Sequence, residues 1–355
     1  MNFQYIILLV MIIGSQTLLS QEKQTEIQWK KLKNIPDQMG FAGAYVGVAN
    51  DYLVIMGGAN FPDGIAPWNG GKKIWTDRIF VLMDDRGDWV EAGHLPVSMG
   101  YGAVTSYHDA IYIAGGSNAQ GHLAQVYKMV WRDDHFINEQ LPDLPHAIAN
   151  CATIRIDKYW YILGGIEYPD SQQALNICWR LDLEQVKQGW EICPPVPGEG
   201  RMLAVAGDLD GKLIVTSGVS LHKGERTYQM DAYICDLNGW RKVAGVPQSV
   251  AAAPNPAWFD SASGNLLIFG GDNGVLASKN LKEKHPGFSN KILYYRSDEN
   301  TWQYTDHDIK IVGEKTWAPV TTSSVFWKGG IVLPTGEIRP GIRSPQVLFG
   351  TFKKE

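Results

Sequence analysis

The stretch "YLVIMGG", Tyr52 to Gly58, has the form that decides the fold of this chain: a short apolar run that ends in a glycine pair. Five further runs share this form and end in Gly or Gly-Gly: "AIYIAGG" (110–116), "WYILGG" (160–165), "KLIVTSG" (212–218), "LLIFGG" (266–271) and "IVLPTG" (331–336). Spacings of about 50 to 65 residues separate them along the 355-residue chain. This period indicates a repeat architecture with one structural unit per run.

Large aromatic residues recur with the same period. Four tryptophans are each followed by Pro seven residues later, and two aromatics are weaker copies: Trp29, Trp89, Trp190 and Trp240, then Phe136 and Trp302. One more strand-like run, such as "DRIFVLM" (77–83), lies between each glycine run and the next aromatic. Each unit therefore has four short antiparallel strands, named a to d here, as in a kelch-type propeller blade. The glycines permit backbone conformations closed to other residues, and the indoles fill space between blades.

The two chain ends show how the ring closes. The last unit ends at "QVLFGTFKKE" (346–355) without a strand d, while "EIQWKKLKNIP" (26–36) is a strand d without a blade before it. We expect the N-terminal strand to complete the last blade, which removes free sheet edges. The sequence thus predicts an all-β, six-bladed kelch-type propeller over residues 21–355. The expected blades are 37–95, 96–144, 145–196, 197–246, 247–306, and 307–355 with strand 26–34.

The first 20 residues have the pattern of a signal peptide. The apolar run from Tyr5 to Gly14 is too short to span a membrane, and small and polar residues follow it up to Ser20. Cleavage near Ser20 predicts a periplasmic or secreted chain without a membrane span; an uncleaved anchor is the alternative. The formal net charge of −5 and the absence of a basic block argue against a nucleic-acid partner.

The four cysteines lie in apolar, strand-like runs: Cys151, Cys178, Cys193 and Cys235. Export would permit disulfides, but a core of this size does not need them. We expect buried free thiols. Only Cys178 and Cys193, which flank a predicted hairpin, are placed to form a bridge.

Polar residues gather where the expected topology forms the mouth of the central channel. The b–c and d–a loops all lie at this face, so residues after a glycine run, or at the start of a strand a, can point into it. Those residues are Asn60, Asn118, Glu167, His222, Asp272, Asn273 and Glu337, together with Tyr101, Asn150, Arg201, Asn255 and Trp317. Two long b–c loops, 59–76 and 272–290, are expected to rim or partly cover the mouth, as functional loops on a rigid scaffold often do.

The last unit carries charge in this slot, in "TGEIRPGIRS" (335–344). A turn at Pro340-Gly341 would direct Glu337 and Arg343 to one place. Such a pair suits a ligand with a carboxylate, because Arg binds the anion and Glu is left for proton transfer. The alternative is an ordinary salt bridge in a loop, which contributes little when exposed.

These stretches resemble a known family. "GFAGAYVGVANDYLVIMGGANFP" (40–62), "WNGGKKIWTDRIFVL" (68–82), "GYGAVTSYHDAIYIAGGSN" (100–118), "GRMLAVAGDLDGKLIVTSG" (200–218) and "TGEIRPGIRS" (335–344) are similar to the sialic acid mutarotases, or N-acetylneuraminate epimerases. The similarity is greater to their cyclically permuted branch, since the unpermuted chains begin at the blade that matches residues 141–194 here. A closed ring keeps its fold when the chain ends are moved.

The resemblance implies which residues act. The family's functional Glu and Arg, in a GE-x-x-P-G-x-R stretch, match Glu337 and Arg343. Arg201 matches an Arg of the equivalent strand a and is expected to help bind, whereas Arg339 has no matching charge and is a secondary candidate. The first blade's loop "ANFPDGIAPWNGG" (59–71) and the short loop of the third blade depart from the family pattern, which bears on which sugar is accepted.

Three functions follow from these observations. The first is a mutarotase that converts the α anomer of N-acetylneuraminate to the β anomer with Glu337 as acid and base and Arg343 as carboxylate clamp; Asn60, Asn118, Asn150, Arg339, Tyr101 and Arg201 are weaker binding candidates. No metal or organic cofactor is expected. The second is a non-catalytic propeller that binds a glycan or protein through its loops. The third, another propeller enzyme, has little support, because the only sialidase-like box, "SDENTW" (297–302), is incomplete and the eight His lack ligand spacing.

Overall fold

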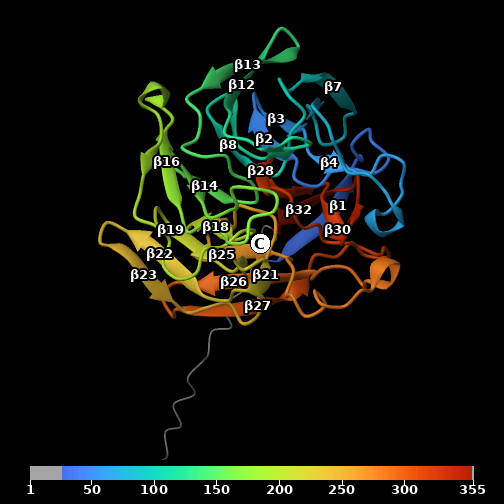
Figure 1. Ribbon diagram of the computed structural model, residues 1–355. Coiled ribbons are helices and arrows are strands. Elements are labelled where there is room, and N and C mark those ends of the chain that lie inside the picture. Colours follow the sequence, from blue (N-terminus) through green and yellow to red (C-terminus); the bar gives the residue numbers. More distant parts are fainter. Residues whose placement is uncertain (1–25, 354–355) are drawn as a thin grey trace, which may run out of the picture.

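The structure is a computed structural model that describes residues 26–353, so the expected signal peptide at 1–20 lies outside the described residues. Six four-stranded antiparallel sheets are arranged around a centre over residues 26–353 (Figure 1). The helical segments of this part of the chain are three short 3-10 turns: η1 (Pro67–Asn69), η2 (Val186–Gln188) and η3 (Lys282–Lys284). Across the same residues, no helix has the length and apolar character needed to cross a membrane. The predicted all-β six-bladed propeller is confirmed.

Each blade runs from an inner strand a to an outer strand d. The inner strands, given as strand a and then strand b, are as follows: blade 1, β2 (Tyr45–Ala49) and β3 (Tyr52–Met56); blade 2, β8 (Ala103–Tyr107) and β9 (Ala110–Ala114); blade 3, β14 (Ala152–Ile156) and β15 (Tyr159–Leu163); blade 4, β18 (Val205–Asp208) and β19 (Leu213–Thr216); blade 5, β24 (Trp258–Asp260) and β25 (Asn265–Phe269); blade 6, β28 (Val325–Trp327) and β29 (Gly330–Pro334). The outer strands, given as strand c and then strand d, are as follows: blade 1, β6 (Arg78–Leu82) and β7 (Trp89–His94); blade 2, β12 (Val126–Arg132) and β13 (His135–Leu141); blade 3, β16 (Cys178–Asp182) and β17 (Glu191–Ile192); blade 4, β22 (Ala232–Asp236) and β23 (Gly239–Val243); blade 5, β26 (Lys291–Arg296) and β27 (Thr301–Asp308); blade 6, β32 (Val347–Phe352) and β1 (Ile27–Leu32).

The glycine that ends every strand b has a conformational cause. The first residue of each pair has φ between +43° and +69°, which Ser217 and Thr335 adopt in two blades. The second residue has φ between +94° and +113°, and it is Gly in all six blades. L-residues tolerate the first conformation at a cost, but the second lies outside their allowed regions. The pattern Gly/Ser/Thr-Gly is therefore a backbone requirement of the turn from strand b towards the mouth.

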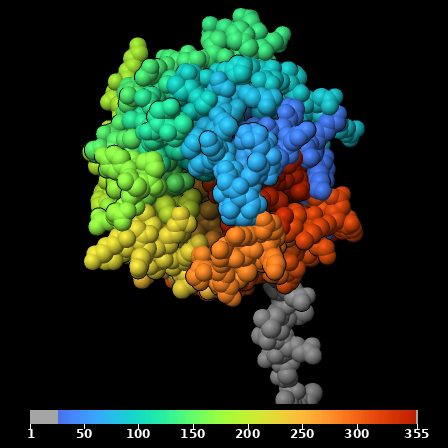
Figure 2. Space-filling model, turned by 45° about the vertical axis from the view of Figure 1, so that its right-hand side comes forward, coloured from blue at the N-terminus to red at the C-terminus, as the bar shows by residue number. Residues whose placement is uncertain are grey.

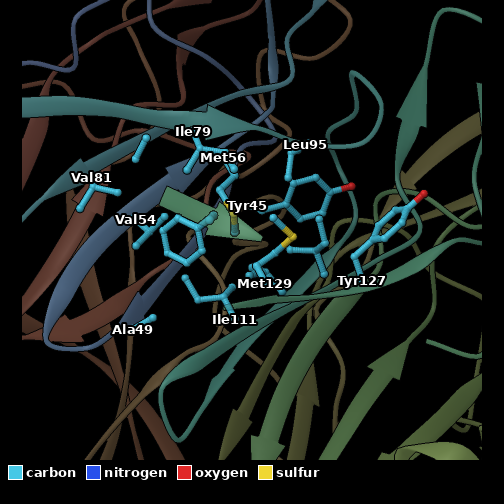
Figure 3. Packing of buried hydrophobic residues seen from close by; sticks show 14 of the residues in the cluster. Tyr45, Ala49, Val54, Met56, Ile79, Val81, Leu95, Ile111, Tyr127 and Met129 are labelled. Atoms are coloured by element: carbon cyan, nitrogen blue, oxygen red, sulfur yellow. The ribbon is translucent and has the colours of Figure 1, made fainter. Parts of the chain in front are cut away.

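The periodic tryptophans join neighbouring blades by hydrogen bonds as well as by packing. Four indole N–H groups donate to a backbone carbonyl near the end of the preceding blade's strand d, at 2.7 to 3.3 Å: Trp89 to Lys33, Trp190 to Pro142, Trp240 to Pro194 and Trp302 to Ala244. The weaker copy Phe136 has no N–H to donate. It packs instead in the apolar cluster between blades 1 and 2, which includes Tyr45, Met56 and Ile111 (Figure 3).

The N-terminal strand closes the ring as expected. β1 pairs with β32 in antiparallel register from Ile27 opposite Phe352 to Leu32 opposite Val347. Trp29 and Ile27 are buried in the cluster between blades 5 and 6, and Leu32 in the cluster between blades 6 and 1. The strand therefore seals two apolar interfaces as well as one sheet edge.

One residue per blade forms a closed backbone ring across the channel. Each residue of the ring donates its N–H to the carbonyl of the next member at 2.7 to 2.8 Å, in the order Gly43, Thr321, Ala252, Leu203, Asn150, Tyr101 and back to Gly43. All six have φ between +54° and +68°. They line a cavity within the channel. We call this arrangement the backbone ring; it lies at the starts of the strands a and forms the floor of the mouth.

All four cysteines are free thiols in the described residues. Cys178 and Cys193 lie beside each other, and the backbone N–H of Cys193 donates to the carbonyl of Cys178 at 2.9 Å. Burial raises the pKa of the Cys151 thiol to about 12. A thiol with so high a pKa is a poor nucleophile at neutral pH, so Cys151 behaves as a core residue.

Candidate active site

The charged stretch of blade 6 forms a small hairpin at the mouth. β30 (Glu337–Arg339) pairs with β31 (Ile342–Arg343), and Glu337 lies opposite Arg343. Gly341 makes the turn with φ +78°, and its N–H donates to Glu337 Oε1 at 2.5 Å. A Cβ on Gly341 would meet the ring of Pro67 at 2.7 Å, so no larger residue fits there. The turn brings Glu337 and Arg343 together, with Oε2 and Nη2 3.9 Å apart.

Arg343 does not behave as half of an ordinary salt bridge. Its side chain is 7% exposed, and its contact with Glu337 is at the outer limit for an ion pair. Its Nη2 donates a long hydrogen bond of 3.4 Å to the Tyr101 hydroxyl, and its guanidinium stacks on the Phe61 ring at 4.6 Å. Nε and Nη1 are buried and have no partner in the described part of the chain. Buried donors are nearly always satisfied in folded proteins, so these two are available to bind a ligand.

Blades 1 and 2 complete the wall around this pair. The Lys73 ammonium lies over the rings of Trp75 and Tyr101, at 4.5 and 4.9 Å from their centroids. His122, in the hairpin of β10 (Ser117–Asn118) and β11 (Gly121–His122), has both ring nitrogens buried without a described partner. Burial lowers the pKa of His122 and outweighs the opposing effect of the Gly121 backbone, and the charge of Lys73 lowers it further, so its imidazole is neutral at pH 7.

Tyr101 connects the backbone ring to the candidate site. Its backbone belongs to the ring, while its side chain reaches Arg343 and Lys73. Burial raises the pKa of its phenol, and the negative charge of Glu337 adds to this, although Arg343 opposes both. Tyr101 is therefore a neutral hydroxyl at physiological pH, able to donate or accept a hydrogen bond.

Long loops cover part of the mouth, as expected from their length. η1 of blade 1 and η3 of blade 5 meet through a hydrogen bond of 2.6 Å from Trp68 Nε1 to Glu283 Oε1. In Figure 2 the light-blue loop of blade 1 stands in front of the red atoms of blade 6 and reaches the orange loop of blade 5. Arg339 belongs to this cover: it donates to the Glu283 carbonyl at 2.9 Å and stacks over Trp317 at 5.0 Å.

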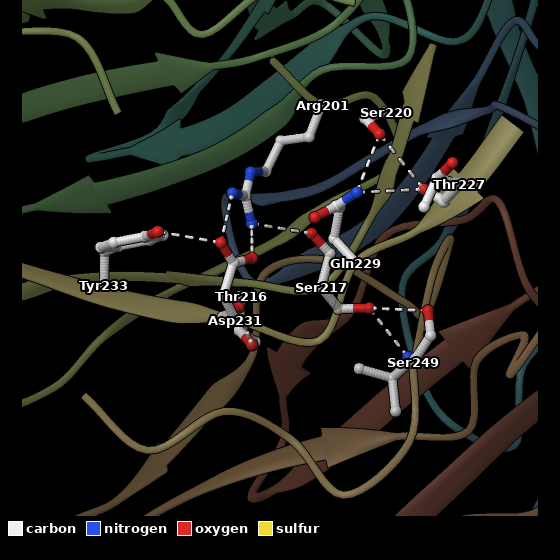
Figure 4. Close-up of polar contacts among 10 residues, drawn as sticks. Arg201, Thr216, Ser217, Ser220, Thr227, Gln229, Asp231, Tyr233 and Ser249 are labelled. Atoms are coloured by element: carbon white, nitrogen blue, oxygen red, sulfur yellow. Dashed lines mark hydrogen bonds and ion pairs between the residues drawn. The ribbon is translucent and has the colours of Figure 1, made fainter. Parts of the chain in front are cut away.

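Arg201 is not brought to the pair. Its side chain is 1% exposed and forms a two-pronged contact with Asp231, at 2.7 and 3.2 Å, within blade 4 (Figure 4). It also donates to the Ser217 carbonyl at 3.2 Å, and the Tyr233 hydroxyl donates to Asp231 at 2.9 Å. Burial raises the pKa of Asp231, but the hydrogen bonds and charge of Arg201 outweigh it, so the pKa lies below its ordinary value.

The three asparagine candidates occupy different places. Asn60 is 5% exposed, and its amide donates to Asp37 Oδ1 at 3.1 Å, which ties blade 1's loop to the d–a connection. Asn118 ends β10 and accepts the Gln120 N–H at 2.9 Å in the hairpin turn. Asn150 is a member of the backbone ring and lines the channel cavity. Their roles as sugar ligands stay predictions.

A variant separates structural from binding roles at Arg201. We expect Arg201→Met to lower the free energy of unfolding by about 3 kcal/mol, because Asp231 is left partly buried without its counter-charge. The wild-type pair contributes at neutral pH and loses its contribution as the pH falls through the lowered pKa of Asp231. Urea titrations of single and Arg201→Met/Asp231→Leu double variants measure this. A raised KM with an unchanged urea midpoint would instead make Arg201 a ligand of the substrate.

Four residues of the site were not predicted from the sequence: Phe61, Lys73, Trp75 and His122. All lie in b–c loops beyond the first polar residue after the glycine run. The available signal was the alternation of aromatic and charged residues in "KKIW" (72–75), in a loop already expected at the mouth. A loop's length shows that it can reach the mouth, but not which of its side chains face inward.

Comparisons with known proteins agree with this architecture. Residues 14–137 match the model of a family described as N-acetylneuraminate epimerase. The N-acetylneuraminate epimerase of Haemophilus influenzae (strain 86-028NP) is 33% identical over 120 residues, which cover 30% of this chain and 32% of the relative. That of Salmonella enteritidis PT4 (strain P125109) is 31% identical over 127 residues, which cover 32% and 33%. The chain thus matches about a third of the length of these relatives.

A solved structure extends the likeness to the whole propeller. The structure of YjhT superposes with a TM-score of 0.66 and 16% sequence identity, covering 91% of this chain and 98% of that one. At this identity the likeness shows the fold. The resemblance to the N-acetylneuraminate epimerase family is thus confirmed in sequence over residues 14–137, and the whole propeller shares its fold with YjhT.

Proposed function

We propose that this protein is a mutarotase that interconverts the α and β anomers of N-acetylneuraminate. The observation that carries the proposal is the Glu337–Arg343 pair at the mouth, in which Arg343 has two buried donors without partners among residues 26–353. The names of the similar proteins support the choice of substrate. This chain matches those relatives over about a third of their length.

The chemistry of the sugar fits the spacing of the pair. In N-acetylneuraminate the carboxylate, the reacting hydroxyl and the ring oxygen are all bonded to the anomeric carbon. Groups that hold the carboxylate and move the hydroxyl proton must therefore be neighbours, as Arg343 Nη2 and Glu337 Oε2 are at 3.9 Å. Either free donor of Arg343, together with Nη2, forms a two-donor edge that matches a carboxylate.

Glu337 moves one proton in the proposed reaction. The Gly341 N–H occupies Oε1, which leaves Oε2 to accept the proton of the anomeric hydroxyl. The bond from the anomeric carbon to the ring oxygen breaks as the carbonyl forms, and the proton passes from Oε2 to the departing ring oxygen. Rotation of the open keto form presents the other carbonyl face, and the same proton transfers run in reverse on closure. Glu337 ends ionised as it began, so atoms and charge balance.

The direct test is proton NMR of α-N-acetylneuraminate freshly released by a sialidase. With purified protein we expect the β anomer to appear faster than in buffer, by a factor of about 10²–10⁴, the range for positioned acid–base catalysis. Heat-denatured protein at the same concentration is the control. An exchange rate equal to that in buffer, with sugar binding retained, would make this a non-catalytic glycan-binding propeller.

A further inference from the structure

The mouth has an unbalanced set of charges. Arg343 and Lys73 are cations, whereas Glu337 is the carboxylate beside them. Burial lowers the pKa of Lys73, the charge of Arg343 lowers it further, and Glu337 opposes both. Arg343 lies 3.9 Å from Glu337 and contacts the same Tyr101 side chain as Lys73, so the three charges lie around one space. A ligand with one negative charge would balance them.

Tyr101 contacts both cations, Arg343 and Lys73, so both face the same ligand space. Its ring carries the Lys73 ammonium at 4.9 Å, and its hydroxyl accepts from Arg343 Nη2 at 3.4 Å. The Arg343 side chain is 7% exposed, whereas Lys73 keeps an exposed surface although neighbouring atoms partly desolvate its ammonium. One cation therefore lies at the base of the site and the other at its entrance, with the same aromatic ring between them.

Lys73 is held without a counter-ion. Its described contacts are the faces of Trp75 and Tyr101, and no carboxylate within residues 26–353 lies in ion-pair distance of its ammonium. Other lysines, such as Lys158 with Asp182 at 3.0 Å, have such partners. An ammonium stacked on two rings and lacking an anion is ready to bind one.

The loop that carries Lys73 is fixed at both ends and in the middle. Lys73 directly precedes β5 (Ile74–Trp75), which pairs with β4 (Ala59–Asn60). Trp68 in the same loop is hydrogen-bonded to Glu283 of blade 5. The ammonium is thus presented by a braced loop, which reduces the entropy that binding would cost.

We propose that Lys73 is the second carboxylate-binding cation of this site and makes it selective for sugar acids over neutral sugars. The inference rests on the proposed function for the identity of the sugar. Lys73 lies in the blade 1 loop, outside the charged stretch of blade 6 that carries Glu337 and Arg343. Because His122 is neutral, Lys73 is the group that provides positive charge at the entrance.

The test compares Lys73→Met with the matched variant Lys72→Met, which removes the neighbouring exposed lysine. Met keeps an apolar stem over the two rings but carries no charge. For N-acetylneuraminate we expect Lys73→Met to raise KM about tenfold, the effect of one lost charge-assisted contact, with kcat within about twofold. Lys73→Arg should restore most of the affinity, and Lys72→Met should match the wild type.

The methyl ester of the same sugar tells charge recognition from loop packing. It lacks the negative charge, so Lys73→Met and wild type should bind it with equal affinity. An equal loss for acid and ester, or an unchanged KM for the acid, would overturn the proposal and leave Lys73 with a packing role.

Calorimetric titration with N-acetylneuraminate separates this inference from the proposed function. If the wild type binds the sugar but does not speed anomer exchange, the mutarotase proposal fails. A tenfold higher Kd in Lys73→Met would still support carboxylate binding by Lys73. If the wild type binds neither acid nor ester, both proposals are overturned.

Discussion

Glu337→Gln is expected to fold normally, to bind N-acetylneuraminate and to lose about 10²–10⁴ in kcat for anomer exchange. The amide oxygen can still accept the Gly341 N–H, so the hairpin of β30 and β31 keeps its turn. The amide nitrogen that replaces Oε2 cannot take up a proton at neutral pH, so the variant cannot move the proton from the hydroxyl to the ring oxygen. NMR exchange rates give kcat, and calorimetry gives Kd on the same samples.

Two arginines of the same hairpin serve as controls for this result. Arg343→Lys should mainly raise KM, by roughly ten- to a hundredfold, because an ammonium cannot reproduce a two-donor edge worth about 1.5–3 kcal/mol. Arg339→Lys should change kcat and KM little, since Arg339 contacts the blade 5 loop. Equal and small effects at Glu337 and Arg343 would leave the stretch as a loop salt bridge and favour a binding propeller.

Deletion of β1 is expected to have the largest effect on stability. A chain that begins at residue 35 loses the β1–β32 ladder and exposes one edge of blade 6. It also loses Ile27, Trp29 and Leu32 from two interblade clusters. Burial of such side chains contributes about 1.5–3 kcal/mol each, so the sum approaches the total stability of a typical protein, about 5–15 kcal/mol.

We therefore expect this deletion variant to lack a cooperative urea transition at 25 °C and to aggregate through its open edge. Circular dichroism during urea titration, with light scattering for aggregation, measures both. Gln28→Ala is the matched control, because Gln28 is on the same strand with an exposed side chain, and it should change stability by no more than about 0.5 kcal/mol. A deletion variant with the wild-type urea midpoint would mean that the ring does not depend on β1 for closure.

The fold was predictable because its determinants are local and repeated. The second residue of each glycine pair must be Gly, and Ser217 and Thr335 show that the first need not be, which is why two units read SG and TG without loss of the signal. The indole of Trp89 donates across to blade 6, so its period follows the blade boundary. The chain ends also predicted the pairing of β1 with β32.

The candidate site was predictable only where a local turn determines it. Pro340-Gly341 set Glu337 beside Arg343 within one hairpin. Arg201 and Asn60 are at the expected backbone positions, but Asp231 and Asp37 hold their side chains. Those partners come from other segments, so strand order alone does not reveal them. Lys73 depends in the same way on how the blade 1 loop lies over Tyr101 of blade 2.

The backbone ring makes the channel a sieve. Six residues joined edge to edge at the spacing of paired strands, about 4.8 Å, enclose an opening roughly 9 Å across between backbone atoms, before their van der Waals radii are subtracted. Water can pass such an opening, but a nine-carbon sugar acid cannot. In the proposed reaction the sugar would therefore enter and leave on the same side of the ring, past the blade 1 loop, and both anomers would share that route.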